Sequence, residues 1–79
     1  MRTKQKRPLY EIASDIYRTW AKVNYAAVPY LQAMEQLESI DDKYFYDSGA
    51  SIVRYFLANA GTWKGESARL IKKELRAML

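Results

Sequence analysis

Side chains that could carry out catalysis are scarce in this sequence. It contains no histidine and no cysteine, so the commonest general base, the commonest metal ligand and thiolate chemistry are all missing. A serine nucleophile would need another base, and no Ser-x-x-Lys pattern supplies a lysine for that role. The sequence therefore predicts a protein that is not an enzyme and has no catalytic residues.

Metal and cofactor sites are not predicted either. Asp41, Asp42 and Asp47 lie close together in the chain, and carboxylates suit a hard cation. However, the alternating acids and the closing glutamate of a calcium loop are absent, and the three glycines lack the spacing of a phosphate-binding loop. We expect no bound metal and no cofactor.

Two groups of cations could contact the phosphates of a nucleic acid, one in a basic tail over residues 1–7 and one on the last predicted helix. They are Arg2, Lys4, Lys6, Arg7, Arg69, Lys72, Lys73 and Arg76. Together they would form a substantial basic surface if they folded onto the same side. The simpler interpretation is a solvated tail and a solvated helix face, whose cations are favoured near the helix C-terminus.

A standard helix-turn-helix is not supported around Gly61. The motif needs a small residue four positions before that glycine and an apolar residue six positions after it, whereas Leu57 and Ser67 stand there. Nucleic-acid binding therefore rests on charge alone.

The aromatic run Tyr44, Phe45 and Tyr46 has no place on a single helix face. It lies in an irregular stretch, residues 39–47, that also holds three aspartates. One interpretation is a loop folded over the core with two rings inside and one outside, because a short strand would find no partner elsewhere in the sequence. The other interpretation is an aromatic, acid-flanked patch that binds another protein.

Apolar residues recur at helical spacing in four segments, which we expect to be helices. Their predicted ranges are 8–23, 26–38, 48–60 and 63–78. The third segment is apolar over much of its circumference, so it is the predicted central helix of the bundle. The first two helices are expected to meet at a sharp bend.

Capping residues indicate how the last two helices are joined. Asp47 is the predicted N-cap of the third helix, and Thr62 is the predicted cap of the fourth. Gly61 suits a left-handed position after the third helix. The two helices should therefore form an αα-hairpin with a tight turn.

Length and charge are consistent with one small domain. The chain has 79 residues and a net charge of +4. It is divided into a basic tail, residues 1–7, predicted to be disordered, and a single helical domain, residues 8–79.

No apolar run approaches the roughly 18–20 residues that span a bilayer. The basic N-terminus has no apolar segment behind it, as a secretory signal would. We expect a cytoplasmic protein without a membrane partner, either a monomer or a weak homodimer.

Two stretches of the sequence resemble a group of small, uncharacterised helical proteins of bacterial phages and other mobile elements. The shared features are Val-Pro-Tyr-Leu, a Tyr-Asp-Ser start to an apolar helix, and Ala-Asn-Ala-x-Thr-Trp-x-Gly-Glu before a basic helix. The resemblance covers roughly residues 8–79. It implies a helical fold and a phage or mobile-element origin, and it favours binding of a host factor or an accessory nucleic-acid role. It implies no activity and no site residues.

The sequence as a whole predicts an all-α bundle of four short helices. The leading hypothesis for its function is a non-enzymatic protein-interaction module of a phage or mobile element, with an unknown protein as partner. The alternative hypothesis is a nucleic-acid-binding accessory protein that uses the basic tail and the basic face of the last helix.

Overall fold

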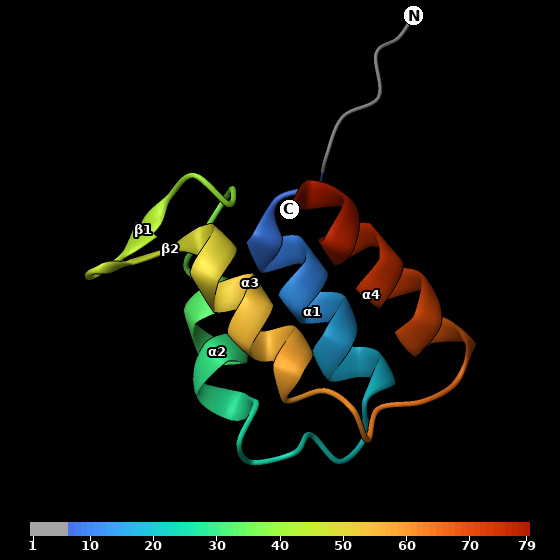
Figure 1. Ribbon diagram of the computed structural model, residues 1–79. Coiled ribbons are helices and arrows are strands. Elements are labelled where there is room, and N and C mark those ends of the chain that lie inside the picture. Colours follow the sequence, from blue (N-terminus) through green and yellow to red (C-terminus); the bar gives the residue numbers. More distant parts are fainter. Residues whose placement is uncertain (1–6) are drawn as a thin grey trace, which may run out of the picture.

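The computed structural model describes residues 7–79, which form a mainly helical fold with one small β-hairpin (Figure 1). Most of the predicted basic tail, residues 1–6, lies outside the described residues. The elements are α1 (Leu9–Thr19), α2 (Val28–Met34), β1 (Lys43–Tyr44), β2 (Asp47–Ser48), α3 (Gly49–Ala58) and α4 (Glu66–Met78). The helical class agrees with the sequence analysis, whereas the two-stranded antiparallel sheet was not predicted.

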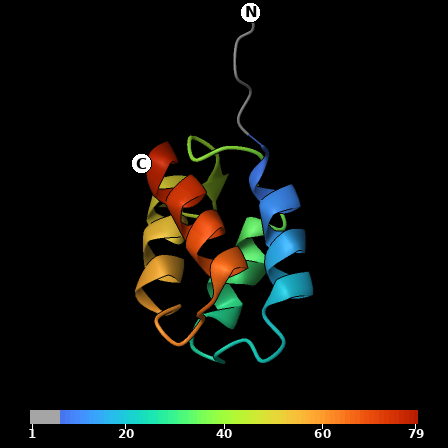
Figure 2. The same ribbon diagram turned by 90° about the vertical axis from the view of Figure 1, so that its right-hand side faces the viewer.

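Successive helices run in opposite directions, as Figures 1 and 2 show. Helix α2 packs against α3 and α1, and α4 packs mainly against α1. Helix α1 therefore joins α4 to the α2–α3 pair. The prediction of a central third helix was wrong, because α3 packs mainly on α2 and leaves Arg54 and Tyr55 exposed.

Helix α1 ends four residues earlier than its apolar spacing predicted. The apolar side chains of Leu9, Ile12, Ala13 and Ile16 are fully buried, whereas Tyr17 is exposed. Trp20 leaves the helix in an extended conformation (φ −110°, ψ 94°). The Trp20 ring stacks on Trp63 at 5.2 Å between ring centroids and meets the edge of Phe56 at 6.2 Å. We call Trp20, Phe56 and Trp63 the aromatic cluster. Its three rings come from three different segments and close one end of the core.

Residues 20–27 connect α1 to α2, so the expected sharp bend was wrong. Within this connection the Asn24 side chain accepts a hydrogen bond from the Ala26 amide and donates one to the Asn59 carbonyl, at 3.2 and 3.1 Å. The connection is thereby tied to the end of α3. Helix α2 then starts at Val28 with Pro29 in its first turn, where a missing N–H is tolerated.

Helix α1 begins on backbone carbonyls that follow α2. The Leu9 and Tyr10 amides donate to the carbonyls of Glu38 and Leu37, at 2.9 and 3.0 Å. The first amides of a helix have no partner inside the helix, so these bonds satisfy groups that would otherwise need water or a side chain. We call residues 37–42, which supply these carbonyls, the capping segment.

The same capping segment holds the start of α3. The Gly49 amide donates to the Asp42 carbonyl at 2.7 Å, and the Ala50 amide donates to the Ile40 carbonyl at 2.9 Å. The side chain that caps α3 is Ser48, whose Oγ accepts from the Ser51 amide at 3.1 Å. The predicted cap, Asp47, is wrong because α3 begins at Gly49, which places Ser48 and not Asp47 at the N-cap position.

Helix α4 begins at Glu66 instead of Trp63, so residues 59–65 form a longer connection than the predicted tight turn. Gly65 precedes the helix with φ of 108°, a conformation that favours glycine. Gly61 does not take the predicted left-handed conformation, and Thr62 does not cap the helix. In this connection, the glycine that takes a left-handed conformation is therefore Gly65 instead of Gly61.

Replacing Gly49 by alanine should destabilise the fold. A Cβ at this position would lie 2.6 Å from the Ser39 carbonyl oxygen and 2.8 Å from the Ile40 Cα, both backbone atoms of the capping segment. We expect the free energy of unfolding to fall by about 1–3 kcal/mol, as for other overpacked sites. Urea denaturation followed by circular dichroism measures this change.

Gly61→Ala is the matched control, because a Cβ at Gly61 meets nothing within 4 Å. It should leave the unfolding free energy within about 1 kcal/mol of the original value. Equal destabilisation by both substitutions would contradict a close backbone approach at Gly49.

Candidate functional site

The aromatic run forms the turn of the β-hairpin. Tyr44 pairs with Asp47 across the two strands, so Phe45 and Tyr46 are the two turn residues. Phe45 has φ of 58°, the left-handed region that hairpin turns of this length usually fill with glycine or asparagine. Such a conformation in a residue with a side chain costs of order 1–3 kcal/mol.

The two turn rings are the most exposed part of the aromatic run. Phe45 is 81% exposed and Tyr46 is 100% exposed, whereas Tyr44 is half-buried against the core. The Phe45 ring meets Tyr44 edge-on, with 4.8 Å between centroids. A loop with two rings inside is therefore wrong, because two of the three rings are exposed. The expectation that a strand would find no partner is also wrong, because β1 pairs with residues 47–48 at the end of the same stretch. We call Phe45 and Tyr46 the aromatic tip.

The base of the hairpin is fixed by hydrogen bonds within the capping segment. The Asp42 carboxylate accepts from the Glu38 and Ser39 amides, at 2.9 and 3.2 Å. Ser39 Oγ accepts from the Asp41 amide at 3.1 Å. Asp42 thus has a structural role. Residues 7–79 contain no group of three acidic, histidine or cysteine side chains placed to hold a metal ion.

Three of the four cations of α4 line a shallow hollow of about 440 Å³ beside the start of the helix. Arg69, Lys72 and Arg76 lie along it, and Lys64 joins them from the connection before α4. Lys72 Nζ donates to the Trp63 carbonyl at 2.7 Å and lies 5.9 Å from the centre of the Trp63 ring. Burial lowers the pKa of Lys72, and the charges of Lys64 and Arg76 lower it further.

A second shallow hollow adjoins the first and adds another cation. Trp63 and Lys64 line both hollows, and Lys22 lines the second one from the α1–α2 connection. We call Lys22, Lys64, Arg69, Lys72 and Arg76 the basic track. Neither Lys22 nor Lys64 was among the predicted cations. Lys22 joins the track only because folding brings the end of α1 next to the connection before α4, whereas Lys64 lies in that connection, close to α4 in the sequence.

Arg7 lies apart from the basic track and holds α1 to α4. Its guanidinium donates to both carboxylate oxygens of Glu74, at 2.8 and 2.9 Å, and also to the Asp15 carboxylate. The hydrogen bond with Glu74 raises the pKa of Arg7 despite partial burial. Of the other predicted cations, Lys73 is exposed but lines neither hollow, and Arg2, Lys4 and Lys6 lie outside the described residues.

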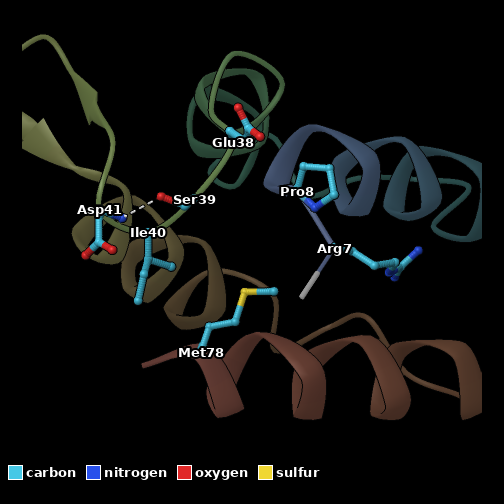
Figure 3. A pocket seen from close by; sticks show the side chains of 7 residues that line it. All are labelled: Arg7, Pro8, Glu38, Ser39, Ile40, Asp41 and Met78. Carbon is cyan, nitrogen blue, oxygen red and sulfur yellow. Dashed lines mark hydrogen bonds between the residues drawn. The ribbon is translucent and has the colours of Figure 1, made fainter. Parts of the chain in front are cut away.

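A third hollow, of about 270 Å³, lies where the start of α1, the capping segment and the end of α4 meet (Figure 3). Pro8, Ile40 and Met78 face this space, while the side chains of Arg7 and Glu38 point away from it. The hollow is therefore a small apolar gap where α1, the capping segment and α4 pack together, and we assign it no chemical role.

The backbone of Phe45 predicts an unusual response to substitution. Phe45→Gly should be more stable than Phe45→Ala by about 1 kcal/mol, because both lose the ring but only alanine keeps a Cβ at positive φ. Denaturant unfolding of the two variants measures the difference.

Tyr46 provides the control for this comparison, since its φ is not positive. There the order should reverse, with Tyr46→Gly less stable than Tyr46→Ala by about 0.5–1 kcal/mol. If the glycine variant were less stable than the alanine variant at both positions, the Phe45 backbone would not be strained.

Lys64→Gln should raise the pKa of Lys72 toward its ordinary value of 10.5, because it removes one of the positive charges that lower it. The lowered pKa means that charged Lys72 disfavours folding at neutral pH. This penalty declines as the pH rises from the lowered pKa to the unfolded-state value. An NMR titration of the lysine side chains measures the pKa.

Lys43→Gln removes the same charge on the far side of the molecule and should leave the Lys72 titration unchanged (Figure 1). If both variants shifted the pKa equally, the cations of the basic track would not act on each other locally.

Within residues 7–79 no helix has the length and apolar character needed to cross a membrane. Comparison of the chain with protein-family models, curated proteins and solved structures finds no match in any of the three. The geometry of the aromatic tip and the basic track is therefore the basis for any statement about function.

Proposed function

We propose that this chain is a non-enzymatic, cytoplasmic protein-interaction module that binds its partner through the aromatic tip. The observation that carries the proposal is the pair of adjacent rings, 81% and 100% exposed, at a turn whose backbone is strained. A strained conformation persists only where the surrounding structure enforces it, and such sites concentrate at functional surfaces.

The aromatic tip has the properties of a binding anchor. Each ring can bury about 150–250 Å² on a partner, which corresponds to about 4–6 kcal/mol per ring before the costs of association. The hairpin is fixed at its base by the capping segment, so it loses little additional conformational freedom on binding. Preorganised aromatic side chains of this kind dominate the affinity of many protein interfaces.

The charges beside the aromatic tip indicate what the partner surface is like. Asp41, Asp42 and Asp47 are exposed around the hairpin, with Lys43 as the one cation among residues 39–47. A complementary surface would be an apolar cleft bordered by basic side chains. The resemblance to small phage and mobile-element proteins favours a host protein as this partner.

Tyr46→Ala should weaken partner binding without unfolding the chain, because the Tyr46 ring makes no buried contact in the free protein. The partner can be captured by a photo-crosslinker placed at position 47, next to the intact aromatic tip, identified by mass spectrometry and purified. We expect its Kd to rise by at least about thirtyfold in Tyr46→Ala, the loss typical of an interface anchor.

Tyr25→Ala is the matched control, since Tyr25 is 87% exposed but lies in the α1–α2 connection. It should bind the purified partner with unchanged affinity. A similar loss in Tyr25→Ala, or full binding by Tyr46→Ala, would show that the aromatic tip is not the anchor.

A further inference from the structure

The basic track is a second surface that the proposed function does not use. Figure 1 places α4 and the β-hairpin on opposite sides of the molecule. A partner seated on the aromatic tip would therefore leave the basic track accessible.

The positive charge of the basic track is not balanced by neighbouring carboxylates. Among residues 7–79, no aspartate or glutamate lines either hollow. The nearest ion pair, Arg69 with Glu66 at 3.9 Å, joins two side chains that are both more than 70% exposed, and such pairs contribute little. Glu74, the other acid of α4, is held by Arg7 on the side that faces α1. An anionic ligand would relieve the repulsion among the cations.

The cations are arranged as a row instead of a single cluster. Arg69, Lys72 and Arg76 follow one face of α4, with rises of about 4.5 and 6 Å along the helix axis. Lys64 and Lys22 extend the row beyond the start of the helix through the second hollow. A row of charges suits a ligand that carries regularly spaced negative charges, such as a phosphate backbone.

The lining of the track argues against recognition of bases. Trp63 and Trp20, the aromatic residues that line the two hollows, are only 3% and 7% exposed and stack on each other, so neither offers a face on which a base could stack. Contacts from cations to phosphates fix the position of a protein on the backbone and carry no sequence information directly.

We propose that the basic track binds the phosphate backbone of nucleic acid without regard to base sequence. The set of residues differs from the one that sequence analysis predicted. Lys22 and Lys64 are added, while Arg7 is engaged with Glu74 and Asp15 and Lys73 lies outside both hollows.

The test is the salt dependence of binding to a short mixed-sequence DNA duplex, measured with the full chain by fluorescence anisotropy. Five phosphate contacts contribute about −4.5 to the slope of log K against log salt concentration, or about −0.9 for each cation. Lys22→Gln and Lys64→Gln should each make the slope shallower by about 0.9. Lys43→Gln removes the same charge from the hairpin and should leave the slope unchanged, and thermal unfolding checks that all three variants fold.

Four results would overturn the proposal. The first is no binding to the duplex at low salt. The second is an unchanged salt slope in Lys22→Gln and Lys64→Gln, together with loss of binding when Arg2, Lys4 and Lys6 are replaced by glutamine. This result would place the contacts in the basic tail instead of the basic track. The third is binding to polyglutamate in place of DNA, which would identify an acidic protein as the ligand. The fourth is a tenfold or larger change in affinity between duplexes of different sequence, which would show base recognition.

Discussion

The fold depends on one set of backbone hydrogen bonds, those that the capping segment makes with the starts of α1 and α3. Its carbonyls accept from two amides of each helix, at 2.7 to 3.0 Å. Helix starts need such partners, and most proteins supply them from side chains or water. Here the two helices share one backbone segment, so their N-termini must lie at the same end of the molecule. Helix α2, which leads into that segment, is then held beside both of them.

The same constraint produces the aromatic tip. Because the Asp42 carbonyl is bonded to the Gly49 amide, the six residues between them must leave the core and return within a short distance. A two-residue hairpin is the tightest way to do this, and its turn falls on Phe45 and Tyr46 whatever their intrinsic preference. The strain at Phe45 is thus a consequence of closure at the base of the hairpin, and the rings project because no element covers the turn.

The sequence predicts the helices and core well, because apolar residues at spacings of three and four mark the buried faces directly. It also groups Arg69, Lys72, Lys73 and Arg76 on one side of the last helix, of which all but Lys73 line the hollow beside α4. The helix ends are predicted poorly, because long-range contacts decide them. Trp20 leaves the helical conformation and stacks on Trp63. Ser48 caps α3 in place of Asp47, because the bonds of the Gly49 and Ala50 amides to the capping segment fix where that helix begins. The hairpin itself lacks the glycine or asparagine that normally marks such a turn. Lys22 joins the basic track through the tertiary fold alone, which no local pattern could indicate.

The residues that stabilise the fold are largely separate from those assigned to binding. Stability comes from the capping segment, the aromatic cluster and the buried stripes of the helices, whereas the side chains of the aromatic tip are exposed and those of the track line its surface. Trp63 is the exception, because its ring belongs to the aromatic cluster while its carbonyl accepts from Lys72 in the basic track. The track therefore takes its shape from a core residue, and the aromatic tip takes its shape from the capping segment. In a chain of 79 residues, each binding surface is positioned by a part of the fold that stability already requires.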